Sequence, residues 1–317
     1  MRILIYGTGV IGTLVGARLE QAGHDVVVLA RGRRLLDIKS LGLVVENVGT
    51  GVRETVSVRA IEKLEPDDPY DLVVVPVRSD HLAEVLFPLA QSRQTPTILF
   101  FGNNARGSEM LTQVLGRERV VLGFPGAGGE LVDGSVRFLM IPQQPTTLGE
   151  LDGTTTKRTK AIASVFERAG FPTVICSDME SWLKTHAAFV TSVAAAVYVA
   201  RGDAASVASD SSLLKLMVES IGDGFRALRS RGVRAVPWNL RLLNELMPEW
   251  FAVRYWRKAF GGPLGRFSFA AHANRARDEM EPLAADVWRL VHAGVASPPT
   301  PSLDRLFRQA GLACVTS

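Results

Sequence analysis

The hydrophobic positions of the first 150 residues fall into short runs rich in Val, Ile and Leu, separated by longer amphipathic stretches. Runs of this length are typical of buried strands, and the stretches between them have helical spacing. The expected strands are "RILIY", "DVVVL", "DLVVVPV", "TILFF" and "VVLGF", with helices over "GTLVGARLEQAG" and "HLAEVLFPLAQ" among them. This alternation predicts an α/β domain built on a doubly wound parallel sheet.

Strand signals fade after "TVICS", and the rest of the chain is mostly helical in its spacing. The helices expected there are Trp182 to Ala200, Ser211 to Arg231, Asn274 to His292 and Ser302 to Ala310. The sequence therefore predicts an α/β domain over residues 1–172 and an all-α domain over residues 173–317, with a ligand site in a cleft between them.

Three glycines follow the first expected strand. Gly7, Gly9 and Gly12 in "YGTGVIG" have the G-x-G-x-x-G spacing and stand directly before a helix. In this pattern the first glycine makes a tight turn, the second lets the backbone approach a pyrophosphate, and the third lets the helix pack on the sheet. We expect a Rossmann-type dinucleotide-binding turn, in which the residues between the glycines also contact the cofactor: Thr8, Val10 and Ile11. A purely structural glycine turn is the alternative.

Cations follow the second expected strand. In a dinucleotide fold this strand ends beside the adenosine ribose, where a carboxylate suits the 2′-hydroxyl of NAD and an arginine suits the 2′-phosphate of NADP. "VVVLARGRR" places Arg31 there, followed by Arg33 and Arg34, with no Asp or Glu beside them. Because a guanidinium binds phosphate through two parallel hydrogen bonds, we expect NADPH, to which Arg33 or Arg34 would add a second charge. The alternative is a solvated helix start.

Polar residues also follow later strands. Arg78 comes after "LVVVPV" and Asn103 after "TILFFG", and ligands of open α/β sheets bind at the carboxyl ends of the strands. Both are therefore candidates for holding a carboxylate or a nicotinamide amide. The segment "GFPGAGG", residues 123–129, is interpreted as a flexible turn rather than a phosphate-binding one.

The helical part supplies a candidate acid. Ser177 and Glu180 in "SDMESWLK" have capping-box spacing, which places Lys184 early in a helix. An ammonium near the positive end of the helix dipole gives up its proton more readily, which suits a proton donor. Ala188 and Ser192 share the face of this helix that carries Lys184. An exposed surface lysine is the alternative.

Charge and composition narrow the list of partners. The net charge is +4 and the pI about 9.3, which suits anionic ligands in general. The basic and aromatic segment "WFAVRYWRKAF" would suit nucleic acid, but as a helix it puts Phe251 and Tyr255 on one stripe, which favours a core or subunit face. We therefore expect no nucleic-acid partner and a possible homodimer through the helical domain.

Neither a membrane nor a metal is expected. The longest apolar run, Ala187 to Ala200, is shorter than the roughly 20 residues that cross a bilayer, and no signal-peptide cleavage site follows the first helix. Cys176 and Cys314 are far apart and lack metal-ligand spacing. These features predict a cytoplasmic protein without a metal site.

The motifs together resemble the ketopantoate reductase family. The resemblance spans nearly the whole chain and is carried by these segments: "GTGVIG", "VPVRSDH", "FFGNNARGSE", "ESWLK", "ARDEMEPL" and "SPPTPSLDRLF". It implies an NADPH-dependent enzyme that reduces the keto group of a branched 2-keto acid. It further implies that Lys184 is the proton donor, that Asn103 holds the substrate or the nicotinamide, and that Asp278 or Glu279 accepts a substrate hydroxyl.

The chain departs from the family pattern near the expected substrate. Arg78 stands where the family usually has lysine, Ala188 and Ser192 stand where it has asparagines, and Ser268 is a candidate for the serine that meets the substrate carboxylate. Lost amides remove hydrogen-bond partners for a polar substrate, so the reaction type is better supported than the substrate.

Two other functions remain open. An opine or 3-hydroxyacid dehydrogenase would use a histidine-based acid, for which His186 and His272 are available. A catalytically idle NADPH-binding sensor would have no need of Lys184 as a proton donor.

Overall fold

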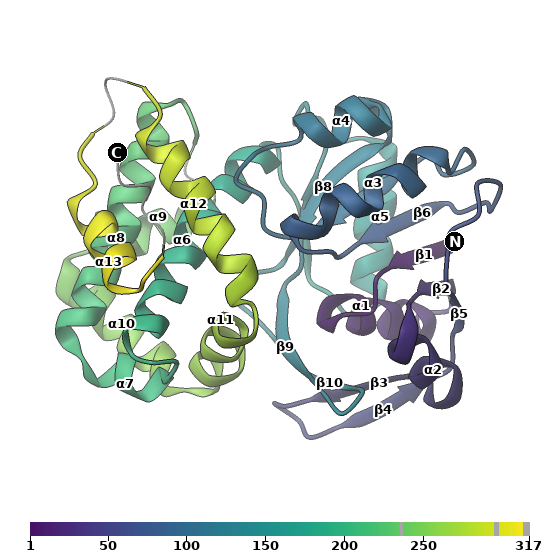
Figure 1. Ribbon diagram of the computed structural model, residues 1–317, viewed down its shortest axis with the longest axis horizontal. Coiled ribbons are helices and arrows are strands. Elements are labelled where there is room, and N and C mark those ends of the chain that lie inside the picture. Colours follow the sequence, from purple (N-terminus) through teal and green to yellow (C-terminus); the bar gives the residue numbers. More distant parts are fainter. Residues whose placement is uncertain (235–236, 295–297, 313–317) are drawn as a thin grey trace. The chain divides into compact units, whose positions relative to one another are not determined.

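The computed structural model describes residues 1–234, 237–294 and 298–312, and its chain divides into two compact units (Figure 1). The first unit comprises Met1–Gly102 and Ser108–Met179, and the second comprises Asn103–Gly107 together with the chain from Glu180 onward. We expected a boundary at Pro172, but β12 (Thr173–Ile175) pairs with β11 (Thr146–Gly149) and therefore lies in the sheet of the first unit. Cys314 lies outside the described residues.

The large sheet of the first unit has eight strands in the order β12-β11-β8-β7-β6-β1-β2-β5. Its remaining strands are β1 (Arg2–Tyr6), β2 (Asp25–Leu29), β5 (Arg59–Ile61), β6 (Leu72–Val75), β7 (Ile98–Phe101) and β8 (Val120–Phe124). The six neighbouring strands β5, β2, β1, β6, β7 and β8 run parallel to one another, and β11 is antiparallel to β8. The strand order β5-β2-β1-β6-β7-β8 is that of a dinucleotide-binding sheet, which confirms the expected fold class.

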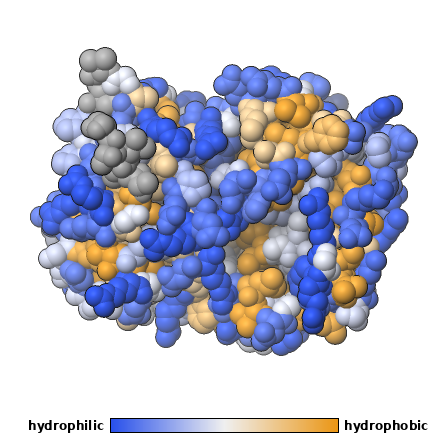
Figure 2. Space-filling view, viewed as in Figure 1, coloured by the Kyte–Doolittle hydropathy of each residue, from blue (hydrophilic) through white to orange (hydrophobic). Residues whose placement is uncertain are grey.

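Helices cover this sheet in Figure 1. They are α1 (Val10–Gln21), α2 (Gly32–Leu41), α3 (Leu82–Gln91), α4 (Glu109–Leu115) and α5 (Lys157–Arg168), with short 3₁₀ turns η1 (Ser79–His81) and η2 (Arg117–Arg119). On this face of the space-filling view, a hydrophobic area lies over α3 and α4, where Phe87, Met110 and Val114 are exposed (Figure 2).

A second sheet in the first unit was not expected. It has the order β4-β3-β10-β9, from β3 (Leu43–Asn47), β4 (Arg53–Val56), β9 (Ala127–Val132) and β10 (Ser135–Met140). Helix α1 packs against the strands of both sheets, and a Cβ on Gly16 would come within 3.1 to 3.5 Å of Leu43 in one sheet and of Val28 and Ile5 in the other. This double coverage explains why α1 is apolar on nearly every side.

The interpretation of residues 123–129 as a flexible turn was wrong. This segment ends β8 and begins β9, and its glycines allow close backbone approach. A Cβ on Gly126 would lie 2.5 Å from the carbonyl oxygen of Gln144, and one on Gly129 would lie 2.3 Å from that of Arg137. The glycines therefore serve strand packing.

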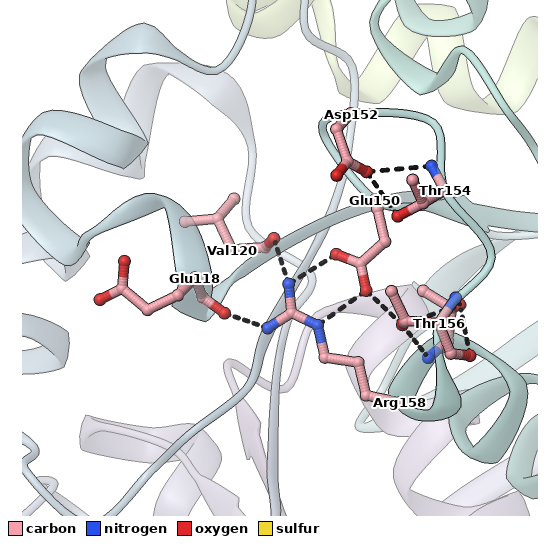
Figure 3. A network of polar contacts seen from close by, with 8 residues as sticks. Glu118, Val120, Glu150, Asp152, Thr154, Thr156 and Arg158 are labelled. Carbon is pink, nitrogen blue, oxygen red and sulfur yellow. Dashed lines mark hydrogen bonds and ion pairs between the residues drawn. The ribbon is translucent and has the colours of Figure 1, made fainter.

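An ion pair between the buried Glu150, which directly follows β11, and the half-buried Arg158 joins this strand to α5 (Figure 3). The Arg158 guanidinium donates to both carboxylate oxygens of Glu150 and also to the carbonyl oxygens of Glu118 and Val120. Burial raises the pKa of Glu150, but Arg158 and the Thr156 hydroxyl outweigh burial and leave the pKa below its usual value. This network ties β8, β11 and α5 together and contains none of the expected site residues.

The second unit is helical apart from its loops. Its helices are α6 (Met179–Val199), α7 (Ala204–Ser209), α8 (Ser211–Ser230), α9 (Trp238–Arg241), α10 (Glu249–Gly261), α11 (Ala271–Arg275), α12 (Arg277–His292) and α13 (Pro301–Gln309), with π-helical segments η3 (Leu242–Leu246) and η4 (Gly265–Ala270). Asp223 on α8 accepts hydrogen bonds from the backbone N–H groups of Ser302 and Leu303 and so caps α13. Among the described residues, no helix is both long and apolar enough to span a membrane.

Helix α10 does not bury the stripe that we considered for the core. Its buried residues are Ala252, Trp256 and Phe260, whereas Phe251 and Tyr255 are each 38% exposed. The expectation that this stripe lies in the core is therefore wrong. That it forms a subunit face stays a prediction.

Candidate functional site

The glycine turn connects β1 to α1 and has the geometry that the sequence predicts. Gly7 has φ +116°, which favours glycine, and a Cβ on Gly12 would lie 1.9 Å from the carbonyl oxygen of Gly7. A Cβ on Gly9 would meet no described atom within 4 Å. Gly7 and Gly12 are therefore required by the protein itself, whereas Gly9 keeps open the space in front of the first turn of α1.

This open space lies where ligands bind in such sheets. The strand order reverses between β1 and β6, and the crevice at such a reversal is the usual dinucleotide site. The first N–H groups of a helix have no carbonyl partner within the helix and attract anions. Val10 and Ile11 are half-buried in this first turn, and Thr8 is buried with its carbonyl oxygen bonded by the Thr13 hydroxyl at 3.1 Å. The turn can thus hold a phosphate through its backbone.

The three arginines after β2 have different surroundings. Arg34 donates to the carbonyl oxygens of Thr8 and Gly134 and to the Thr13 hydroxyl, at 2.8 to 3.2 Å. Arg33 is paired with Asp37 at 2.9 Å. Arg34 is therefore engaged within the protein, whereas Arg33 forms a surface ion pair, since its side chain is 88% exposed.

Arg31 remains exposed at the position before α2. No carboxylate in the described part of the chain pairs with it. Burial raises the pKa of the Tyr6 hydroxyl, and the neighbouring Arg31 charge offsets part of that rise. Since Tyr6 is the last residue of β1, the Arg31 guanidinium lies at the carboxyl edge of the sheet, where a ribose phosphate is expected.

Arg78 follows β6 and forms a bidentate ion pair with Asp80, at 2.7 and 3.0 Å. Partial burial raises the pKa of Asp80, but Arg78 outweighs burial and leaves the pKa below its usual value. The Arg78 side chain is 31% exposed. Arg78 therefore keeps an accessible face while its direction is fixed by Asp80.

Asn103 begins a loop, Asn103–Gly107, that groups with the helical unit and is called the Asn103 loop below. Its amide nitrogen donates to Glu279 Oε1 at 2.8 Å, and both side chains are buried. Among the described residues nothing hydrogen-bonds to the Asn103 Oδ1 atom, which is also buried. A buried acceptor without a partner is uncommon and suits a ligand that donates a hydrogen bond.

Two candidates for the late acid were left open, and the structure separates them. Glu279 is 5% exposed and bonds Asn103, whereas Asp278 is exposed on the first turn of α12. Only Glu279 is therefore brought to Asn103.

Lys184 lies on α6, which begins at Met179, two residues after Ser177. The Lys184 ammonium lies 3.7 Å from Glu180 and its side chain is 21% exposed. Glu180 in turn approaches the Asn103 loop, because a Cβ on Gly107 would lie 3.7 Å from its carboxylate. Lys184 thus belongs to the same polar group as the loop and can still reach solvent.

The other expected substrate residues are buried. Ala188 would contact a Cβ on Gly224 of α8 at 3.3 Å, and the Ser192 hydroxyl pairs with that of Ser220 at 2.9 Å. Both residues are 0% exposed and pack between α6 and α8. Ser268 on η4 is 8% exposed, and its hydroxyl has no hydrogen-bond partner among the described residues.

His186 has the wrong properties for a catalytic acid. His186 stacks on Trp182 with ring centroids 5.0 Å apart, and burial, helped by the charge of His272, lowers its pKa to about 3. A histidine with that pKa is neutral near pH 7. This disfavours the histidine-based alternative.

Sequence reasoning missed three charged residues of this group: Glu180, Arg106 and Asp286. Arg106 donates to Asp286 at 2.6 Å, 180 positions away. Glu279 and Asp286 lie seven positions apart on α12, and this helical spacing is visible in the sequence. The sequence does not show that Asn103 and Arg106 are their partners.

Comparisons with known proteins show which family and fold this chain resembles. Residues 3–153, a little under half of the chain, match the family model described as ketopantoate reductase PanE/ApbA. A curated relative from Pyrococcus horikoshii, named 2-dehydropantoate 2-reductase, is 24% identical over 259 residues, covering 78% of this chain and 80% of the relative.

Solved structures share the fold over 98% of this chain. D-mandelate dehydrogenase with NADH and anilino(oxo)acetate has a TM-score of 0.76 and 16% identity, covering 98% of this chain and 97% of that one. 2-Dehydropantoate 2-reductase from Geobacter metallireducens has a TM-score of 0.75 and 20% identity, covering 98% and 99%.

The resemblance that the motifs suggested is therefore confirmed: residues 3–153 match the PanE/ApbA ketopantoate reductase model, and relatives named 2-dehydropantoate 2-reductase, which are oxidoreductases acting on a CH–OH/C=O group, are similar to this chain.

Proposed function

We propose that this protein is an NADPH-dependent reductase of a 2-keto acid. The observation that carries the proposal is the buried Asn103 side chain, whose amide nitrogen donates to Glu279 and whose Oδ1 atom has no hydrogen-bond partner among the described residues. The half-buried Lys184 is paired with Glu180, which approaches Gly107 at the other end of the Asn103 loop. Buried polar atoms left without partners discriminate strongly in favour of ligands that satisfy them.

The residues of the first unit fit a dinucleotide. The backbone of Gly9 to Gly12 would hold the pyrophosphate, Arg31 would bind the 2′-phosphate, and Arg78 would lie beside the ligand at the end of β6. When bound, NADPH supplies the hydride that reduces the carbonyl carbon. Gly9 contributes the free space, since any side chain there would occupy it.

The residues of the second unit fit the keto acid. Lys184 would donate a proton from Nζ to the carbonyl oxygen as hydride reaches the carbonyl carbon, which leaves a 2-hydroxy acid and a neutral amine that regains a proton from solvent. Glu180, at 3.7 Å, holds the ammonium in place before the transfer. Asn103 Oδ1 would accept a hydrogen bond from the ligand, and Glu279 would orient the Asn103 amide. Ser268 is proposed to donate to the substrate carboxylate.

The substrate is proposed to be less polar than ketopantoate. Ala188 and Ser192 replace amides and are used in packing against α8, so they offer the substrate no hydrogen bonds. The fold shared with a mandelate dehydrogenase is compatible with an aromatic or bulky 2-keto acid. NADPH oxidation measured with a panel of 2-keto acids tests this, and a marked preference for ketopantoate would contradict it.

Cofactor choice is tested with a matched pair of variants. Arg31→Ala should weaken NADPH binding by about tenfold or more, as expected for a charge-assisted hydrogen bond, and leave NADH binding unchanged. Arg33→Ala removes a charge two positions away that is already paired with Asp37, and should change neither cofactor. Equal losses for NADPH and NADH in Arg31→Ala would refute the 2′-phosphate contact.

A homodimer through the helical unit completes the proposal. Trp250 is 68% exposed, and it continues the exposed face of α10 formed by Phe251 and Tyr255. Aromatic residues of this kind are enriched in protein interfaces. Sedimentation of the parent and of Trp250→Glu tests it: a dimer that the substitution leaves intact would exclude this face.

A further inference from the structure

The Asn103 loop is rigid within itself. Asn104 Oδ1 accepts hydrogen bonds from the N–H groups of Arg106 and Gly107, each at 2.9 Å, and its amide nitrogen donates to the Gly107 carbonyl at 2.8 Å. Gly107 adopts φ +89°, which closes the turn. The next residue after Asn104, Ala105, is 4% exposed and packs in the core of the helical unit. A movement of one end of this loop is therefore transmitted to the other.

Helix α12 holds the loop at both ends. Glu279 bonds Asn103 at the start, and Asp286 bonds Arg106 near the end, at 2.8 and 2.6 Å. Positions i and i+7 lie on one face of a helix, so the two carboxylates face the loop together. Asp286 is only 8% exposed, whereas the Arg106 side chain is 68% exposed. The buried carboxylate is the fixed partner, and the arginine reaches over to it.

We propose that the Arg106–Asp286 pair positions Asn103, so that Arg106 acts as a positioning residue for the reduction. This inference rests on the proposed function and deepens it. With the pair intact, the loop presents the Asn103 amide to Glu279 in one orientation and keeps Oδ1 directed at the ligand. Without it, the Asn103–Glu279 hydrogen bond is the one remaining side-chain link to α12 among the contacts described here, and it must fix the loop alone.

The chain supplies a matched control on the same carboxylate. Arg289 donates to the other oxygen of Asp286 at 2.5 Å, but it lies on α12 itself, three positions away, and is 56% exposed. Arg106→Met and Arg289→Met each remove one cation from Asp286. Only Arg106→Met releases the loop.

Two measurements on the full chain test the proposal. Arg106→Met should lower kcat for the best 2-keto acid by about tenfold, the order expected when a catalytic group is displaced by a fraction of an ångström, while the NADPH dissociation constant stays unchanged. Arg289→Met should keep the parent kcat. Arg106→Lys retains the charge and should recover part of the loss. Hydrogen exchange should become faster at the Arg106 and Gly107 amides in Arg106→Met alone.

The outcomes separate this inference from the proposed function. Unchanged exchange in Arg106→Met, or equal effects of the two methionine variants, overturns the positioning role. Faster exchange with an unchanged kcat also overturns it, because the loop would then move without consequence. If the parent protein reduces no 2-keto acid, the proposed function is wrong, and the exchange rates alone decide whether Arg106 holds the loop.

Discussion

Replacing the glycines of the turn by alanine separates folding from cofactor binding. A Cβ on Gly12 would lie 1.9 Å from the Gly7 carbonyl oxygen, whereas nothing described lies within 4 Å of a Cβ on Gly9. Real contacts between such atoms are seldom closer than about 3.4 Å, so α1 would have to retreat by about 1.5 Å in Gly12→Ala. Gly9 has φ −68°, which alanine adopts freely.

The two substitutions therefore have different costs. Helix α1 is packed between two sheets and cannot retreat without opening both contacts, so Gly12→Ala should destabilise by about 3 kcal/mol, the upper part of the range for overpacking. Gly9→Ala changes only an N-terminal cap and should cost less than about 1 kcal/mol. At about 2 to 4 °C per kcal/mol, Tm should fall by about 6 to 12 °C for Gly12→Ala and by less than about 4 °C for Gly9→Ala.

Cofactor binding should be affected by Gly9→Ala, the variant that costs little stability. The methyl group of Gly9→Ala would occupy the space proposed for the pyrophosphate, so NADPH affinity should fall by about tenfold or more in a protein that is still folded. Thermal unfolding and NADPH fluorescence titration give the two readouts. If Gly9→Ala binds NADPH as the parent does, the pyrophosphate does not lie at this turn; if Gly12→Ala melts with the parent, the packing argument is wrong.

Three further predictions concern single side chains. Lys184→Ala should lower kcat by about 10² or more with little change in NADPH affinity, and Lys184→Arg should fail as well because guanidinium does not release its proton; near-parent rates in both would leave Lys184 a surface residue. The pKa of His186 is lowered from 6.5 to about 3 by burial. Because this histidine is protonated below about pH 6.5 in the unfolded chain but stays neutral in the folded chain, the free energy of unfolding should fall by about 2 kcal/mol between pH 8 and pH 5. Urea titrations at several pH values check this, and His186→Phe should abolish the loss if the histidine causes it. Burial raises the pKa of Asp223, so stability from this group declines as pH rises through the usual aspartate range; Asp223→Asn keeps an acceptor for the α13 N–H groups and should stay within about 1 kcal/mol of the parent at pH 7, whereas Asp223→Ala should lose about 2 kcal/mol. Equal losses in the two Asp223 variants would show that capping contributes nothing.

The parts of the fold that the sequence predicted are those whose signal is local. Strands β1, β2 and β6 are buried on both faces and therefore read as continuous apolar runs. The second sheet was missed because its strands carry charges and glycines, as in "RETV" and "AGGELV", and their burial depends on α1 packing over them. No local pattern records that a helix covers a polar strand.

The candidate site divides in the same way. The glycine turn is a local motif, and its positions were predicted individually. The Asn103–Glu279 pair joins residues 176 positions apart, and nothing in either segment names the other. Likewise Arg31 and Arg34 are the same residue type three positions apart. The hydrogen bonds of Arg34 to Thr8, Thr13 and Gly134 distinguish it from the exposed Arg31, which is the residue proposed to bind the 2′-phosphate.

The Asn103 loop also affects how this protein can be divided for engineering. Because the loop groups with the helices although it lies between two strands of the sheet, the helical unit is not one continuous stretch of sequence. A fragment that starts at Glu180 would lack Ala105 in its core and would leave Glu279 and Asp286 without Asn103 and Arg106. In a chimera that exchanges helical units between relatives, residues 103–107 should therefore be transplanted with the helices, and the first unit should keep its own flanking residues.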